Sequence, residues 1–141
     1  MGAPPVHRCS VLIVDDDAEA REVLALELSE IGYGVATVEN GRQALDYLRS
    51  HADICIIAVD LLLPVMDGAK FRAAQLRDRS LAWIPVVVIS GAPDGAERAR
   101  QLGARAFVGK PLNLEEVRES LRRIGCCQSK SRTGRSRGET R

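Results

Sequence analysis

The sequence predicts an α/β fold, a doubly wound five-stranded parallel sheet flanked by five helices. Short apolar runs rich in β-branched residues alternate five times with longer segments of helical periodicity. Glycine, proline and capping residues separate the two kinds of segment. The 141 residues show no internal repeat and no second domain. Such an alternation implies right-handed crossovers, with helices on both faces of the sheet.

The five expected strands are the apolar runs at residues 11–14, 35–38, 54–59, 84–89 and 106–108. The third run is continuous and ends at Asp60, and Pro64 and the Asp67-Gly68 pair follow it. A continuous apolar run closed by turn residues is typical of a strand buried on both faces. We therefore expect this strand at the centre of the sheet, with Asp60 at its carboxyl end.

The first expected helix spans residues 18–31 and carries an apolar stripe, with Arg21 among the charged residues mostly outside it. Asp16 and Glu19 have the spacing of a capping box, and Gly32 with Gly34 ends the helix. The stripe consists of Val23, Leu24, Leu26 and Leu28.

Four further helices are expected, and three of them begin at capping patterns. These patterns are Asn40-x-x-Gln43, Asp94-x-x-Glu97 and Asn113-x-x-Glu116. The remaining helix, third in chain order, covers residues 69–78. The residues expected to face the core are Ala44, Leu45 and Leu48 after the first pattern, and Phe71, Ala74 and Leu76 in residues 69–78.

Composition is that of a globular protein, with 45% hydrophobic and 28% charged residues. No apolar stretch is long enough to span a membrane, and the N-terminal residues lack an apolar signal core. The four cysteines form no CxxC pair and no disulfide-framework spacing. These features together predict a cytoplasmic location with no membrane partner.

We expect three parts in the chain: an N-terminal extension at residues 1–9, a domain at 10–125 and a basic tail at 126–141. The net charge is +1, yet from Ser129 onward five basic residues face one acid, so the domain itself is mildly acidic. The tail has no hydrophobic residues after Gly125 except its cysteines, and we expect it to be disordered. It also lacks aromatic residues and a helix-turn-helix pattern, which argues against nucleic-acid binding.

Five polar residues follow or end strands that lie far apart in the sequence: Asp15, Asp16, Asp60, Ser90 and Lys110. Since the carboxyl ends of parallel strands form one edge of the sheet, we expect these side chains to converge there. Three close carboxylates repel one another unless a cation lies among them, and Mg²⁺ (or Mn²⁺) suits oxygen ligands. A carboxylate beside such a metal, a hydroxyl and an ammonium is equipped to accept a phosphoryl group.

The motifs at these positions resemble the receiver domain of the response-regulator family of two-component signal transduction. The matching segments, in order, are VLIVDDD, DLLLPVMDG, VVVISG and LGARAFVGKPL, and they extend over roughly residues 11–124. Any one of them is weak evidence, but four in order at compatible spacing are strong evidence. The resemblance implies the flavodoxin-like topology of receivers.

By the same resemblance, Asp60 is the phosphoacceptor. Asp15 and Asp16 hold Mg²⁺ together with Asp60 and the backbone carbonyl of Leu62. The positions two after Asp60 and two after the strand-ending serine, here Leu62 and Ala92, affect access of water to the acyl phosphate. Neither side chain offers a base, so we expect slow or moderate self-dephosphorylation.

The resemblance also assigns a switch. Ser90 and Lys110 each bind one phosphoryl oxygen, and the bond between Lys110 and Pro111 is cis. Phe107 occupies the position of the switch aromatic, which turns inward as Ser90 moves toward the phosphoryl group. This change alters the face made by the fourth helix and the fourth and fifth strands.

The implied function is a phosphorylation-controlled signalling domain, which is not an enzyme beyond its own phosphorylation and dephosphorylation. Its phosphoryl donor is a histidine kinase or a histidine phosphotransfer protein, and its output is contact with a downstream protein or a phosphorylation-linked homodimer. Alternatives are a receiver-like scaffold that is not phosphorylated, and a receiver cut from a longer regulator or hybrid kinase. An aspartyl-nucleophile phosphatase using Asp15 and Asp17 is a third, although Glu19 stands where that family has Thr or Val.

Overall fold

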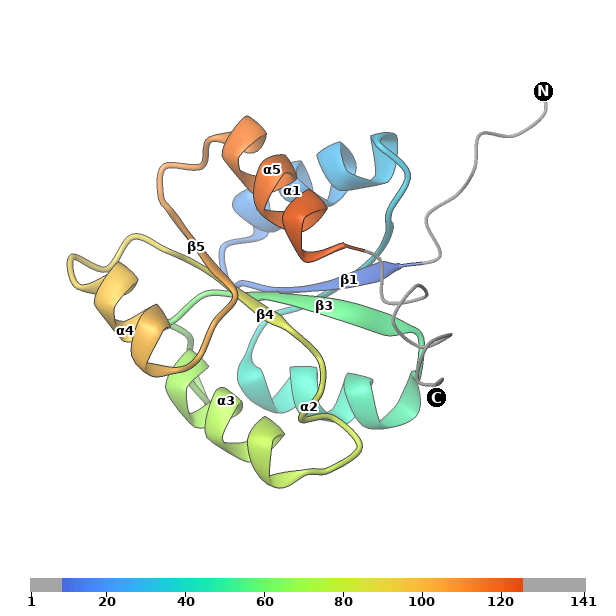
Figure 1. Ribbon diagram of the computed structural model, residues 1–141, viewed down its shortest axis with the longest axis vertical. Coiled ribbons are helices and arrows are strands. Elements are labelled where there is room, and N and C mark those ends of the chain that lie inside the picture. Colours follow the sequence, from blue (N-terminus) through green and yellow to red (C-terminus); the bar gives the residue numbers. More distant parts are fainter. Residues whose placement is uncertain (1–8, 126–141) are drawn as a thin grey trace.

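The computed structural model describes residues 9–125, which form one parallel sheet with helices on both faces (Figure 1). The strand order is β2-β1-β3-β4-β5, and every neighbouring pair is parallel. In chain order the elements are β1 (Ser10–Val14), α1 (Ala18–Glu30), β2 (Gly34–Val38), α2 (Gly41–Ser50), β3 (Ile54–Val59), α3 (Gly68–Arg77), β4 (Val86–Ser90), α4 (Gly95–Gln101), β5 (Ala106–Gly109) and α5 (Leu114–Ile124). The predicted fold class is confirmed. The predicted tail, and the extension up to residue 8, lie outside the described residues.

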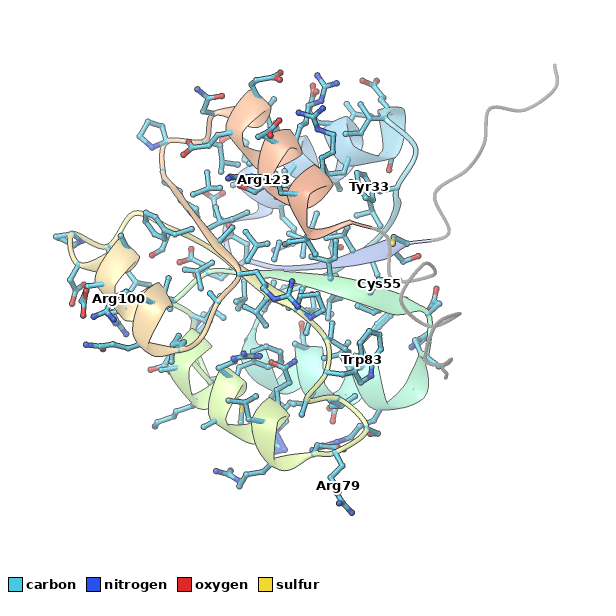
Figure 2. The ribbon with its side chains drawn as sticks, in the orientation of Figure 1. Tyr33, Cys55, Arg79, Trp83, Arg100 and Arg123 are labelled. Atoms are coloured by element: carbon cyan, nitrogen blue, oxygen red, sulfur yellow. The ribbon has the colours of Figure 1, made fainter. Side chains whose placement is uncertain are left out.

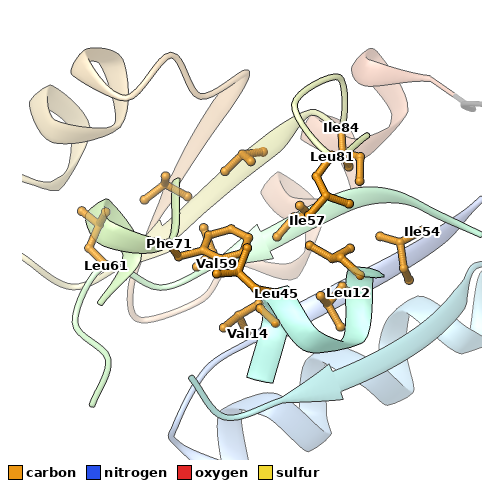
Figure 3. Close-up of a cluster of buried hydrophobic side chains, with 14 of the residues drawn as sticks. Leu12, Val14, Leu45, Ile54, Ile57, Val59, Leu61, Phe71, Leu81 and Ile84 are labelled. Atoms are coloured by element: carbon orange, nitrogen blue, oxygen red, sulfur yellow. The ribbon is translucent and has the colours of Figure 1, made fainter. Parts of the chain in front are cut away.

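The core consists of two layers separated by the sheet. On one face, Leu12, Ile57 and Val59 pack with residues of α2, α3 and α4, including Phe71 (Figure 3). On the other face, the alternate residues of the same strands pack against α1 and α5. Every residue of β3 is buried, which confirms its central position.

Capping residues start the helices, but not always the predicted ones. Asp17, and not Asp16, caps α1, since its side chain accepts hydrogen bonds from the backbone of Glu19 and Ala20. Asn40 and Asn113 cap α2 and α5 as expected. Asp94 precedes α4 but makes no side-chain capping bond. The consequence for α1 is that Asp16 stands outside the helix, on the loop that follows β1.

The predicted apolar stripe of α1 is half wrong, because Leu24 and Leu28 are buried while Val23 and Leu26 are exposed. Leu24 and Leu28 lie one turn apart, whereas Leu26 lies about 200° around the helix from Leu24. In α3, Phe71 and the unpredicted Gln75 are buried one turn apart for the same reason, and Leu76 is exposed. Because Val23 and Leu26 are exposed, α1 has apolar side chains on its solvent-facing side.

One further difference concerns the segment before β4. The strand begins at Val86, two residues later than expected, because Ile84 closes a turn onto Leu81 and Pro85 has no amide hydrogen for a ladder. Trp83, labelled in Figure 2, lies in the same segment, where it is exposed and donates its ring N–H to the carbonyl of Ser80.

Cys9 and Cys55 are both buried. Cys55 is disulfide-bonded, which the spacing of the cysteines did not predict. Among residues 9–125, no helix is long and apolar enough to cross a membrane.

Candidate functional site

The candidate site forms where neighbouring strands end at the same level. Val14 of β1 pairs with Val59 of β3, so the next residues, Asp15 and Asp60, leave the sheet side by side. Ser90 of β4 pairs with Gly109 of β5, and Lys110 follows directly. The register of the parallel sheet therefore brings together residues that are up to 95 positions apart in the sequence.

Asp60 is a nearly buried carboxylate, with 6% of its surface exposed. Its Oδ1 accepts a hydrogen bond from the Leu62 backbone N–H at 3.1 Å, and its Oδ2 accepts one from Lys110 Nζ at 2.8 Å. The chain returns past it at Gly68, where a Cβ atom would lie 2.6 Å from the Asp60 carbonyl oxygen. Only glycine allows this close approach, which explains the Asp67-Gly68 pair after the strand.

Lys110 bridges the two strand ends. Its Nζ donates to Asp15 Oδ2 at 2.9 Å as well as to Asp60, and its backbone N–H donates to the Ser90 carbonyl. Burial by itself lowers the pKa of Lys110, but the hydrogen bonds and charges of Asp60 and Asp15 outweigh it, so the pKa is raised. The ammonium therefore stays protonated at neutral pH. The bond from Lys110 to Pro111 is cis, as the resemblance implied.

Asp16 completes an acidic cluster with Asp15 and Asp60, in which one oxygen of each lies within 4.8 Å of the others. Asp15 is 7% exposed and its Oδ1 accepts from the Asp17 backbone N–H, whereas Asp16 is exposed. One ammonium against three carboxylates leaves two negative charges, which a single divalent cation would balance. The donor set, oxygen only and partly open to solvent, fits a hard divalent ion that keeps some of its waters.

Ser90 and Phe107 lie at the same edge but outside this cluster of charges. Ser90 is buried, and its Oγ accepts from the Ala92 backbone N–H at 3.2 Å. Phe107 is half-buried, and its ring lies against Gly95 at the start of α4, where a Cβ atom would be 2.8 Å from the ring. The aromatic ring and the start of α4 are thus in direct contact.

Arg21 also lies at the site, although it was predicted only as a charged residue outside the apolar stripe of the first helix. Its Nη1 donates to the backbone carbonyl of Asp15 at 2.7 Å, and its side chain is only 15% exposed. No spacing rule connects a helix side chain to a carbonyl six residues earlier. The only feature of the sequence that could have indicated this role was a charged residue close to the apolar stripe of the helix.

A shallow hollow of about 340 Å³ adjoins the site, between α1 and the segment after β5. It is lined by Asp17, Glu19, Ala20, Val23, Lys110, Pro111 and Leu112. The exposed apolar surface of α1 therefore continues up to the bridging lysine.

Comparison with known families and sequences gives a consistent result. A family model described as response regulator receiver domain matches residues 11–122. The chain is 34% identical over 116 residues to response regulator MprA of Mycolicibacterium vanbaalenii, covering 81% of this chain and 49% of that protein. It is 32% identical over 125 residues to two-component response regulator ORR11 of rice (Oryza sativa subsp. indica), covering 87% and 82%. It is also 32% identical over 129 residues to hybrid signal transduction histidine kinase E of Dictyostelium discoideum, covering 86% and 8%.

Solved structures agree. The chemotaxis response regulator CheY4 of Vibrio cholerae superposes with a TM-score of 0.75 at 28% identity, covering 82% of this chain and 98% of that one. The receiver domain of a signal transduction histidine kinase from Syntrophus aciditrophicus gives a TM-score of 0.74 at 30% identity, covering 82% and 89%. The chain spans less than half the length of several of the curated relatives it matches, for example 8% and 49% of two of the proteins above.

Proposed function

This chain belongs to the response regulator receiver domain family, and we propose that it accepts a phosphoryl group on Asp60 from a histidine kinase or a histidine phosphotransfer protein. The observation that carries the proposal is the Asp60 carboxylate itself. It is nearly buried and paired with Lys110. One of its oxygens lies close enough to oxygens of two further aspartates for all three to bind one metal ion. A carboxylate held by these partners is fixed in orientation, as a nucleophile must be.

In the transfer, an oxygen of Asp60 forms a bond to phosphorus while the bond from phosphorus to the donor's imidazole nitrogen breaks. The imidazole keeps the electron pair of the broken bond. Lys110, already in contact with Asp60, pairs with one phosphoryl oxygen, and the Ser90 hydroxyl donates to another. The nucleophile and the ammonium thus need little rearrangement.

Mg²⁺ (or Mn²⁺) is the proposed cofactor, held by Asp15, Asp16, Asp60 and the backbone carbonyl of Leu62. When bound, the metal offsets negative charge on the phosphoryl oxygens. Without a counter-charge, an incoming phosphoryl group would be repelled by three carboxylates. This is the reason to expect phosphorylation to depend on a divalent cation.

The proposed output is a change on the face of α4, β4 and β5. The contact of Phe107 with Gly95 supports it, because any movement of the ring changes the packing at the start of α4. A downstream protein or a second phosphorylated copy would bind this face. The donor would dock on the other side of the site, over the hollow beside α1 with its exposed Val23.

Slow loss of the phosphoryl group is also proposed. Leu62 projects an exposed apolar side chain beside Asp60, and Ala92 is equally unable to orient water. The phosphoryl lifetime of the wild type should be longer than that of Leu62→Asn. Equal lifetimes would contradict the idea.

Two forms of the wider protein fit these relatives. Relatives include regulators and hybrid kinases much longer than this chain, so it is either a stand-alone receiver or one part of a longer protein. The division into residues 1–9, 10–125 and 126–141 remains a proposal. A cytoplasmic location remains a prediction, and the disulfide at Cys55 does not favour it.

The test is incubation with acetyl phosphate and Mg²⁺, followed by measurement of acid-labile phosphate. Wild type and Asp53→Asn should be labelled, since Asp53 is exposed before β3, at its end remote from Asp60. Asp60→Asn should not be labelled, and removal of Mg²⁺ with a chelator should abolish labelling of the wild type. An unlabelled wild type favours the scaffold, and turnover of a phosphate ester that survives Asp60→Asn favours the phosphatase.

A further inference from the structure

We propose that Arg21 is a positioning residue, which holds the loop of Asp15 and Asp16 so that the Asp16 carboxylate faces Asp60. This inference rests on the proposed function and adds to it a residue outside the predicted acid, hydroxyl and lysine set. Arg21 lies in the first turns of α1, directly beside that loop.

Arg21 closes the loop from two points. Its backbone N–H donates to the Asp17 carbonyl at 2.9 Å, and its side-chain Nη1 donates to the Asp15 carbonyl at 2.7 Å. A hydrogen bond from a guanidinium is charge-assisted and stronger than one between neutral groups. The side chain is 15% exposed, so this bond is partly shielded from water. The direction of the Asp15 carbonyl is therefore fixed from outside the loop.

Fixing that carbonyl matters for Asp16 more than for Asp15. The Asp15 side chain already has two partners, the Asp17 backbone N–H and Lys110. The Asp16 carboxylate accepts no hydrogen bond from any residue in the described part of the chain. However, the Asp15 carbonyl and the Asp16 nitrogen share one planar peptide group, so the direction of the carbonyl sets where Asp16 begins.

The second contact of Arg21 does not account for its position. Its Nη2 lies 4.0 Å from Glu39 Oε2, and the Glu39 side chain is 62% exposed. An exposed pair at that distance contributes little. The carbonyl bond is thus the principal interaction of the guanidinium, and its effect is on the acidic cluster.

The experiment is calorimetric titration of the full chain with MgCl₂ alone, without phosphate. Arg21→Ala should bind Mg²⁺ about tenfold more weakly than the wild type, the usual effect of losing a group that orients a metal ligand. Arg21→Lys can still donate to the Asp15 carbonyl, so it should regain most of the affinity. Glu39→Gln, which keeps the carbonyl bond, should bind like the wild type.

Several results would overturn the proposal. One is Arg21→Ala that is folded by circular dichroism yet binds Mg²⁺ within twofold of the wild type. Another is Arg21→Lys that binds as weakly as Arg21→Ala, since a positioning bond needs only a charged donor. If Arg21→Ala does not fold, Arg21→Lys and Arg21→Gln decide, and equal binding by the two would refute a charge-assisted bond. A wild type that binds no Mg²⁺ and takes no phosphate refutes the proposed function, and with it this role.

Discussion

The two ends of the sheet bury polar side chains in different ways. At the end where the strands begin, Gln75 is fully buried: its Nε2 donates to the Leu81 and Ile84 carbonyls, and its Oε1 accepts from Arg72. At the end where the strands finish, Asp60 and Asp15 both accept hydrogen bonds from the Lys110 ammonium. The exposed Asp16 lies beside them, on the side that is open to solvent. The central group of the first network, the Gln75 amide, is neutral, and both its oxygen and its nitrogen have hydrogen-bond partners. The second carries unbalanced charge.

This difference distinguishes polar groups that stabilise the fold from polar groups that can bind a ligand. A buried amide with every partner in place stabilises one arrangement of loops and offers nothing to a ligand. Clustered carboxylates with a single cation among them retain negative charge, which favours binding of a second cation. The position of a polar residue at the carboxyl ends of parallel strands, rather than its burial, therefore marks it as a candidate for function.

The largest expected effect is at the structural end. Gln75→Leu removes the side-chain donor to two buried carbonyls. The Leu81 carbonyl keeps the Ile84 backbone N–H, but the Ile84 carbonyl loses its donor, which should lower the free energy of unfolding by about 3 kcal/mol. The rate of phosphorylation by acetyl phosphate should not change. Urea denaturation and the labelling assay measure the two quantities, with Gln101→Leu on the exposed side of α4 as control. A large loss of labelling in folded Gln75→Leu would remove the distinction between the two ends.

At the chemical end, Lys110→Ala should reduce the rate of phosphorylation about 100-fold, which corresponds to about 2.7 kcal/mol of transition-state stabilisation. The cause is the loss of an ammonium that contacts both carboxylates. Lys70→Ala, at an exposed lysine of α3, is the matched control. Rates for the two variants within threefold of each other would show that the bridge is only structural.

We also expect backbone strain at the end of the sheet where the strands finish. Val65, in the loop between β3 and α3, has φ of 65° and is the only non-glycine residue with positive φ among residues 9–125. Its side chain is 82% exposed, so packing does not require valine there. Val65→Asn should raise the free energy of unfolding by about 1 kcal/mol, because asparagine tolerates this region.

Val65→Thr keeps the β-branched shape and should match the wild type in the same urea titration. If Val65→Asn is no more stable than Val65→Thr, the loop holds no strain that the side chain relieves.

The smallest effect is the pH dependence of the bridge. Because the pKa of Lys110 is raised in the folded protein, its contribution to stability is complete below the ordinary value of 10.5 and is lost as pH rises through the folded pKa. The difference in unfolding free energy between wild type and Lys110→Met should therefore be constant from pH 7 to 9 and shrink above pH 10.5. A difference that stays constant to pH 12 would mean that Lys110 does not titrate as part of the bridge.

Much of the fold followed from the sequence because its signals are local. The continuous apolar run of β3 was predicted with its correct bounds, and Asn40 and Asn113 were recognised as caps. Asp16 was mistaken for a cap because two adjacent aspartates have almost the same spacing to Glu19, and only the path of the loop decides between them. Val23 and Leu26 were assigned to the core because hydrophobicity alone does not reveal which side of α1 meets the sheet.

The sequence by itself determined the alternation of strands and helices, and with it the convergence of Asp15, Asp16, Asp60, Ser90 and Lys110 at one edge. It could do so because parallel strands all finish on the same side. Only the tertiary structure decided which of these groups touch: Lys110 between Asp15 and Asp60, Arg21 on the Asp15 carbonyl, and the ring of Phe107 against Gly95. Those contacts depend on strand register, side-chain rotamers and loop paths. These are set by packing between segments distant in the chain, which no local pattern encodes.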